Sequence, residues 1–208
     1  MKGENGLQIR KERPDDYRTV ENLTREAFWN VYRPGCVEHY VLHVLRDDAA
    51  FVPALDYVLE ADGEIAAHIA YAEGTLQTEC GTLPLLLFGP VSVLPRLQGK
   101  GYGSRLIAFT LEQARALGYP AVVITGAPAY YHRFGFESAS AHGIFYEGMD
   151  PREESPFFMV KFLDSAADGA LKGVYTDPAC YFPDMAAVEA FDRAFPPKVK
   201  EKRPGQLE

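Results

Sequence analysis

A glycine-rich turn between a β-type run and a helical pattern most constrains how this chain can fold. Residues 91–94 end the run, and the turn Gln98-Gly99-Lys100-Gly101-Tyr102-Gly103-Ser104 follows. From Ser104 to Gly118, apolar residues recur at the spacing of an amphipathic helix. Glycines let a backbone approach an anion closely, and the first N–H groups of a helix have no partner within it. The turn is therefore predicted to hold a phosphate group.

The segments around this turn predict a mixed sheet. Residues 121–125 (AVVIT) are typical of a buried strand, so strand, crossover helix and strand imply a parallel pair. Upstream, residues 55–60 and 65–71 are expected to form an antiparallel hairpin closed at Asp62-Gly63. The fold class predicted is α/β (α+β) with a mostly antiparallel sheet.

The remaining elements are expected from local patterns. We expect strands at 7–11, 85–93 and 157–162, helices after Pro14 and over 37–46, and a helical turn at 129–134. The strand 85–93 is expected to be interrupted by a bulge or splayed edge at Gly89-Pro90, because proline donates no ladder hydrogen bond. We place one domain over 1–163, with 164–208 as an extension packed on it. The extension is expected to contain a strand at 174–175, a helix over 185–195 and a mobile basic tail over 196–204.

Composition excludes several classes of protein. The net charge of −8 argues against nucleic acid as the main partner, because nucleic-acid binding needs surplus Lys and Arg. The start of the chain lacks the apolar core of a signal peptide, and the apolar run 83–88 is too short to span a bilayer, so we expect a cytoplasmic protein without membrane contact. Three cysteines without a CxxC pair argue against a disulfide framework and a zinc site.

Two other phosphate-binding motifs do not fit the turn. The Walker pattern GxxxxGK[ST] is absent. The dinucleotide pattern GxGxxG fails because position 104 is Ser104. A tight turn alone would not need three glycines beside Gln98 and Lys100, which favours ligand binding.

Three features in order resemble the GNAT superfamily of N-acetyltransferases. They are the strand 91–93, the signature Gln98-x-x-Gly101-x-Gly103 and the later Tyr131-x-x-x-Gly135-Phe136. The likeness covers residues 7–163 and implies helices on both sheet faces, a splayed parallel strand pair and acetyl-CoA as cosubstrate. It implies that backbone N–H groups from Gln98 to Ser104 hold the pyrophosphate. The cofactor-binding residues so implied are Val91, Ser92, Val93, Gln98, Gly99, Lys100, Gly101, Tyr102, Gly103 and Ser104.

Acetyl transfer from a thioester requires a neutral amine, an oxyanion donor and a proton for the departing thiolate. In the resembling fold the oxyanion donor is a main-chain N–H, here of Val91 or a neighbour. The acid is expected to be Tyr131, since a phenol with a pKa of about 10 suits a thiolate of similar basicity. Tyr130 is the neighbouring candidate, and no metal is expected.

The base is left open. Many family members carry a glutamate on the central strand, but residues 85–90 contain no carboxylate. Glu73, His68 or Glu60 could act through water, or the amine could lose its proton to solvent. A catalytically silent acetyl-CoA sensor is therefore the alternative function.

The acceptor is expected to be a small-molecule or peptide amine. His39 and His43 lie four apart on a predicted helix, but the glutamate of HExxH is missing, so a helix surface or cleft wall is favoured over a metal site. Aromatic residues gather over 28–57, and with the acidic charge they suggest a pocket for an organic cation. These residues are Phe28, Trp29, Tyr32, Tyr40, Phe51 and Tyr57. A homodimer is an assembly that the sequence leaves open.

Overall fold

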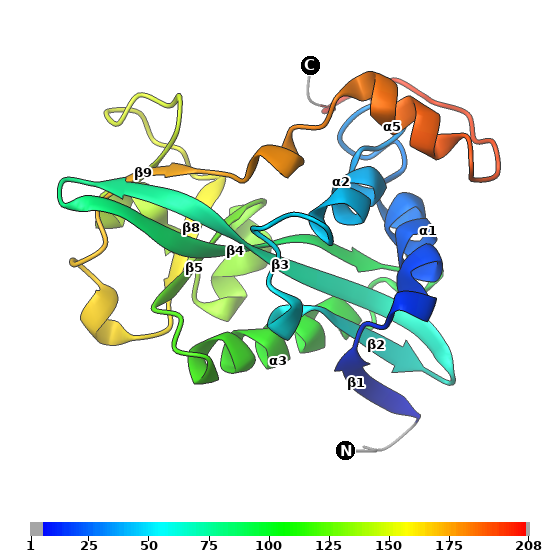
Figure 1. Cartoon of the computed structure of the whole chain (residues 1–208), viewed down its shortest axis with the longest axis horizontal. Coiled ribbons are helices and arrows are strands. Elements are labelled where there is room, and N and C mark those ends of the chain that lie inside the picture. Colours follow the sequence, from blue (N-terminus) through cyan, green and yellow to red (C-terminus); the bar gives the residue numbers. More distant parts are fainter. Residues whose placement is uncertain (1–5, 207–208) are drawn as a thin grey trace. The chain divides into compact units, whose positions relative to one another are not determined.

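The computed structural model of the chain describes residues 6–206 (Figure 1). These residues divide into two compact units, each described by itself. The first unit holds the described residues up to Ala70, then Pro90–Ile107, then those from Ala179 onward. The second unit holds Tyr71–Gly89 and Ala108–Pro178. The predicted extension over 164–208 is divided between the two units: residues 164–178 belong to the second unit and residues 179–206 to the first.

The first unit contains an antiparallel ladder of β1 (Leu7–Lys11), β2 (Tyr57–Ala61) and the first part of β3 (Glu64–Thr78). The turn between β2 and β3 has positive φ at both Asp62 (54°) and Gly63 (82°). This is the geometry that an Asp-Gly hairpin turn requires. The predicted hairpin is confirmed.

Three helices accompany this ladder: α1 (Tyr17–Phe28), α2 (Glu38–Leu45) and α5 (Met185–Asp192). Asp184 caps the start of α5, because its carboxylate accepts hydrogen bonds from the N–H groups of Ala186 and Ala187. Helix α5 ends three residues before the predicted end of the helix at 195. Its Val188 packs in a buried cluster with Val37 and Val41.

The tail after α5 differs from the mobile segment that its composition predicts. The carbonyl of Val199 accepts hydrogen bonds from Trp29 Nε1 at 2.9 Å and Asn30 Nδ2 at 3.0 Å. Lys198 forms an ion pair with Glu26 at 2.8 Å. Asn30 has a left-handed backbone (φ 59°) just after α1, so it presents polar groups that the tail satisfies. Composition alone does not reveal this pairing.

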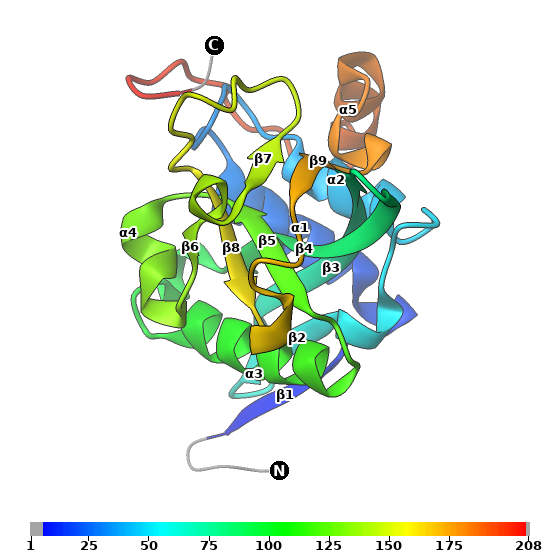
Figure 2. The same cartoon turned by 90° about the vertical axis from the view of Figure 1, so that its left-hand side faces the viewer.

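In the second unit the strands follow the order β3-β4-β5-β8-β6. Figure 2 shows β5 (Ala121–Thr125), β8 (Phe158–Phe162) and β6 (Glu137–Ser138) side by side. β4 (Gly81–Val93) pairs parallel with β5, with Leu86 opposite Val122 and Leu87 opposite Val123. The sheet is mostly antiparallel with this parallel pair, as predicted.

A short strand arrangement completes the second unit. β9 (Gly173–Thr176) pairs antiparallel with β3 and parallel with β7 (Ile144–Tyr146). β9 covers the strand predicted at 174–175, whereas β6 and β7 are too short to show a periodic pattern.

Two details of the chain path bear on the candidate site. β4 continues as one strand through Gly89 and Pro90, because the fixed φ of proline fits an extended strand. Its parallel pairing with β5 is limited to Leu86 and Leu87, so the two strands separate before Gly89, which agrees with the predicted splayed edge. Helix α3 (Tyr102–Ala116) follows the glycine-rich turn, and α4 (Pro128–Tyr131) follows β5. No helix among the described residues is both long and apolar enough to cross a membrane.

Candidate functional site

The glycine-rich turn of the first unit ends at the start of α3, where Tyr102 and Ser104 are half-buried and Gly103 is buried. Gly99 and Gly101 have φ of +77° and +82°, and a Cβ on either would meet nothing within 4 Å. The Arg105 N–H donates to the Gly101 carbonyl at 3.0 Å, which is the first bond of the helix. Within residues 6–206, the N–H groups of Tyr102, Gly103 and Ser104 donate to no other group. Three donors at the positive end of a helix dipole suit an anion.

Side chains around the turn mainly fix its shape. Gln98 Nε2 donates to the Val93 carbonyl at 3.2 Å, which ties the turn to the end of β4. The Lys100 side chain is exposed and adds a positive charge beside the donors. Ser92 is buried, and its Oγ donates to Thr24 Oγ1 on α1 at 3.0 Å. Val91 and Val93 alternate with Ser92 along the strand and are half-buried. The part of β4 that can contact a ligand is therefore its backbone, and not the Ser92 hydroxyl.

Tyr131 closes α4 in the second unit and lies among aromatic rings. Its ring centroid is 4.9 Å from that of Tyr130 and 6.0 Å from those of Phe88 and Phe136. Gly135 ends the next turn with φ +78°, which lets the chain reverse and bury Phe136 completely. The Tyr-x-x-x-Gly-Phe spacing thus packs Phe136 against Tyr131.

Gly126 fixes where the Tyr131 ring lies. A Cβ at position 126 would lie 2.4 Å from Tyr131 Cε2, a distance that real Cβ contacts do not reach. The ring therefore packs directly over the backbone at this position. Sequence analysis missed Gly126, because a single glycine after a strand gives no signal of which ring it contacts.

The candidate residues fall into two groups. The first unit brings together Gln98–Ser104 with Val93, and the second unit brings together Tyr131, Phe88 and Phe136. Tyr130 packs edge-on against Tyr131. The guanidinium carbon of Arg133 lies over the Tyr130 ring, 4.5 Å from its centroid.

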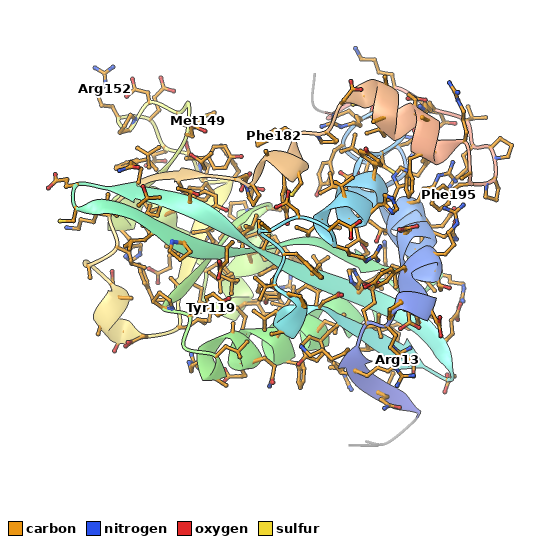
Figure 3. The ribbon with its side chains drawn as sticks, viewed as in Figure 1. Arg13, Tyr119, Met149, Arg152, Phe182 and Phe195 are labelled. Atoms are coloured by element: carbon orange, nitrogen blue, oxygen red, sulfur yellow. The ribbon has the colours of Figure 1, made fainter. Side chains whose placement is uncertain are left out.

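Each candidate base is already engaged. Glu73 accepts a hydrogen bond from the hydroxyl of Tyr119, which is labelled in Figure 3, at 2.8 Å. Burial together with this carboxylate raises the pKa of Tyr119 to about 12. Glu60 pairs with Arg10 at 2.6 Å. His68 is fully buried with Nε2 2.8 Å from Asp56 Oδ1, and burial lowers its pKa to about 4. None of them is an open base.

His39 and His43 do not share a site. His39 is buried, with Nε2 3.1 Å from Asp192 Oδ1 and Nδ1 3.3 Å from Cys36 Sγ. His43 instead lies 2.9 Å from Glu21. Burial raises the pKa of Cys36 far above its usual range, so this Cys-His-Asp arrangement holds an inert thiol.

Several aromatic residues expected to bind a cation already contact the chain's own cations. The guanidinium carbon of Arg25 lies 4.2 Å from the Trp29 ring centroid, and Lys198 Nζ lies 5.4 Å from it. Lys11 Nζ lies 3.9 Å from the Tyr57 centroid. These contacts stabilise the first unit and leave less aromatic surface for a ligand than the sequence suggests.

A buried polar cluster of the first unit was also not predicted. Atoms of Glu12, Asp56 and His68 that could bind a metal lie within 4.8 Å of one another. Arg46 donates to Glu12 through Nη2 at 2.7 Å and Nε at 3.0 Å. The guanidinium therefore already supplies the positive charge that a metal would bring. The four residues are far apart in sequence, so no motif marks them.

The sequence matches a known family and named relatives. A family model described as an acetyltransferase (GNAT) domain matches residues 8–139. The Escherichia coli K12 protein named uncharacterized N-acetyltransferase YhbS is 30% identical over 163 residues, covering 78% of this chain and 92% of that protein. YjhQ from the same strain, also named an uncharacterized N-acetyltransferase, is 34% identical over 97 residues, covering 47% and 53%.

Solved structures share the fold. The structure of YhbS from Escherichia coli in complex with CoA superposes with a TM-score of 0.75 at 26% identity, covering 88% of this chain and 96% of that one. A GNAT family acetyltransferase from Brucella melitensis in complex with acetyl-CoA gives a TM-score of 0.66 at 29% identity, covering 84% and 97%.

Proposed function

The chain belongs to the GNAT family of acetyltransferases, and on that premise we propose that it transfers the acetyl group of acetyl-CoA directly to a primary amine. The start of α3 carries this proposal. Three N–H groups without a protein partner among the described residues, reached through two left-handed glycines, suit the pyrophosphate of CoA. The CoA and acetyl-CoA complexes of the two similar structures support this cosubstrate.

The reaction can be written with the chain's own groups. The neutral amine attacks the thioester carbon, so a C–N bond forms and the carbonyl oxygen gains negative charge. A β4 main-chain N–H at Val91 or a neighbour stabilises this oxyanion. The C–S bond then breaks, Tyr131 gives its proton to the thiolate, and the nitrogen gives up one proton to water, from which Tyr131 is reprotonated. No metal is needed for any step.

In this scheme the protonated form of the acceptor amine loses its proton to water before it attacks. Residues 85–90 of β4 contain no carboxylate, and Glu60, His68 and Glu73 are engaged as described above. The rate at low acceptor concentration should then rise with pH as the neutral fraction of the amine rises.

Binding and turnover test the proposal separately. Acetyl-CoA at a hundred times its Kd should stabilise the protein by about 2.7 kcal/mol, whereas ATP and NAD at equal concentration should add much less. Tyr131→Phe should lower kcat by about 100-fold or more without changing the Kd of acetyl-CoA, because only proton donation is lost. Tyr130→Phe is the matched control. An equal loss in both variants, or no loss in either, would exclude Tyr131 as the acid.

A silent acetyl-CoA sensor is the second candidate. The missing carboxylate on β4 favours it. Acetyl-CoA binding without turnover of any amine in a panel of polyamines, amino acids, aminoglycosides and peptide N-termini would support the sensor over the enzyme.

A further inference from the structure

An aromatic cluster with one acidic side chain lies in the second unit. Tyr146 at the end of β7 has its ring centroid 6.1 Å from that of Phe157 and 5.2 Å from that of Phe158. Phe158 stacks on Tyr175 of β9 at 5.4 Å. Asp177, just after β9, accepts a hydrogen bond from the Tyr146 hydroxyl. We refer to these five residues as the 146–177 cluster.

Asp177 is a half-buried carboxylate without a cationic partner. Within residues 6–206, no Lys, Arg or His side chain forms an ion pair with it. Burial raises the pKa of Asp177, and hydrogen bonds from Tyr146 and Tyr175 oppose this shift. Removing a carboxylate from water without a counter-charge costs free energy. A bound cation would offset that cost.

Two apolar residues and one acidic residue in or next to the cluster are exposed to solvent. Phe157 is 38% exposed, and Met149 is 45% exposed on the loop after β7 (Figure 3). Glu147 is exposed, its N–H is anchored to the Tyr175 carbonyl at 2.8 Å, and its charge contributes to a raised pKa of Tyr146. Aromatic rings beside carboxylates attract organic cations through cation–π contact and charge.

The cluster adjoins the packing of Tyr131. The Gly126 N–H donates to the Phe157 carbonyl at 2.8 Å. The Tyr131 ring packs against the same glycine, where a Cβ would lie 2.4 Å from Tyr131 Cε2. One residue therefore separates the backbone of Phe157 from the proposed acid.

We propose that the 146–177 cluster binds a positively charged group of the acceptor, with Asp177 as its counter-charge and Tyr146 and Phe157 as its aromatic walls. The inference rests on the proposed function, because it names the class of acceptor for that reaction. The amine that attacks must be neutral, so the group that stays charged is a second one. The acceptor is accordingly a diamine or polyamine rather than a simple amine.

Acceptor selectivity tests this assignment. Cadaverine is a diamine, and pentylamine is its counterpart with one amine. The wild-type kcat/KM for cadaverine should exceed that for pentylamine by about tenfold or more, as expected for one well-placed charge contact. Asp177→Asn keeps the side-chain oxygen for Tyr146 and should bring this ratio close to one, whereas Asp177→Glu should retain part of it. Glu153→Gln, an exposed carboxylate of the same unit, is the control and should leave the ratio unchanged.

The outcomes separate the two proposals. A wild-type ratio near one, or a ratio that Asp177→Asn leaves unchanged, overturns the cluster assignment while acetyl transfer stands. If neither amine is acetylated but another amine of the panel is, the cluster assignment is overturned. If no amine is acetylated, the proposed function fails, and calorimetry of cadaverine against the CoA-saturated protein then decides on the cluster. Binding that Asp177→Asn weakens tenfold supports it, and equal binding to both proteins overturns it.

Discussion

Replacing Gly126 by alanine should disable Tyr131 without touching it chemically. The added Cβ would lie 2.4 Å from Tyr131 Cε2, and ordinary contact begins at 3.4 Å, so the ring edge must move by about 1 Å. A displacement of about 1 Å in a reacting group can cost about 100-fold in rate. We therefore expect Gly126→Ala to lower kcat by about 100-fold, or about 2.7 kcal/mol in activation free energy.

The assay is steady-state acetyl transfer at saturating acetyl-CoA, with the Kd of acetyl-CoA measured in parallel. That Kd should stay unchanged, because the anion donors at the start of α3 are not altered. Overpacking should also cost about 1–3 kcal/mol of stability, so rates are measured well below the unfolding transition. Ala127→Ser, an exposed neighbour, is the matched control.

A double-mutant cycle shows whether the loss acts through Tyr131. Gly126→Ala should cost little further activity in the Tyr131→Phe background, because the proton donor is already absent. A full 100-fold loss in that background, or wild-type kcat in the single variant, would refute the reasoning.

Three further predictions follow from the first unit. Gly101→Ala places an L-residue at φ +82°, which costs about 1–2 kcal/mol, and calorimetry should show about tenfold weaker acetyl-CoA binding. Burial lowers the pKa of His39 from 6.5 to about 4, so the unfolded chain takes up a proton before the folded one as the pH falls. The free energy of unfolding therefore falls as the pH drops from 6.5 to about 4. In urea unfolding of His39→Gln, the slope of this free energy against pH should be shallower by about 1.4 kcal/mol per pH unit. Asp192→Ala leaves the Arg25 guanidinium, whose side chain is 1% exposed, without its partner at 2.6 Å, and should lower the free energy of unfolding by about 3–5 kcal/mol.

Local sequence patterns predicted the elements whose causes lie within a few residues. The Asp62-Gly63 turn joins two neighbouring strands because its positive φ angles suit the twist of a hairpin. The turn 98–104 opens α3 because its glycines and the helical periodicity are contiguous. The local geometry of the proposed anion-binding turn was therefore predictable from the chain alone.

Contacts between distant residues could not be predicted in this way. Arg25 and Asp192 are 167 residues apart, and no sequence pattern near either residue indicates that they pair. The pairing of Asp177 with Tyr146 depends on how β7 and β9 align, and the effect of Gly126 depends on where the Tyr131 ring folds back. Burial and strand pairing supply this information, and a single sequence does not contain it.

The pairing of α1 with the last part of the chain affects how the protein is made. During synthesis, α1 and the adjacent Trp29 leave the ribosome well before Asp192, the partner of Arg25, and Val199, the partner of Trp29. Because burying a guanidinium without a counter-charge is strongly unfavourable, the buried face of α1 stays unpacked until Asp192 has been synthesised. The second unit, by contrast, is complete once residue 178 has emerged. Translation should therefore yield a folded second unit first, and the first unit should close only near the end of synthesis.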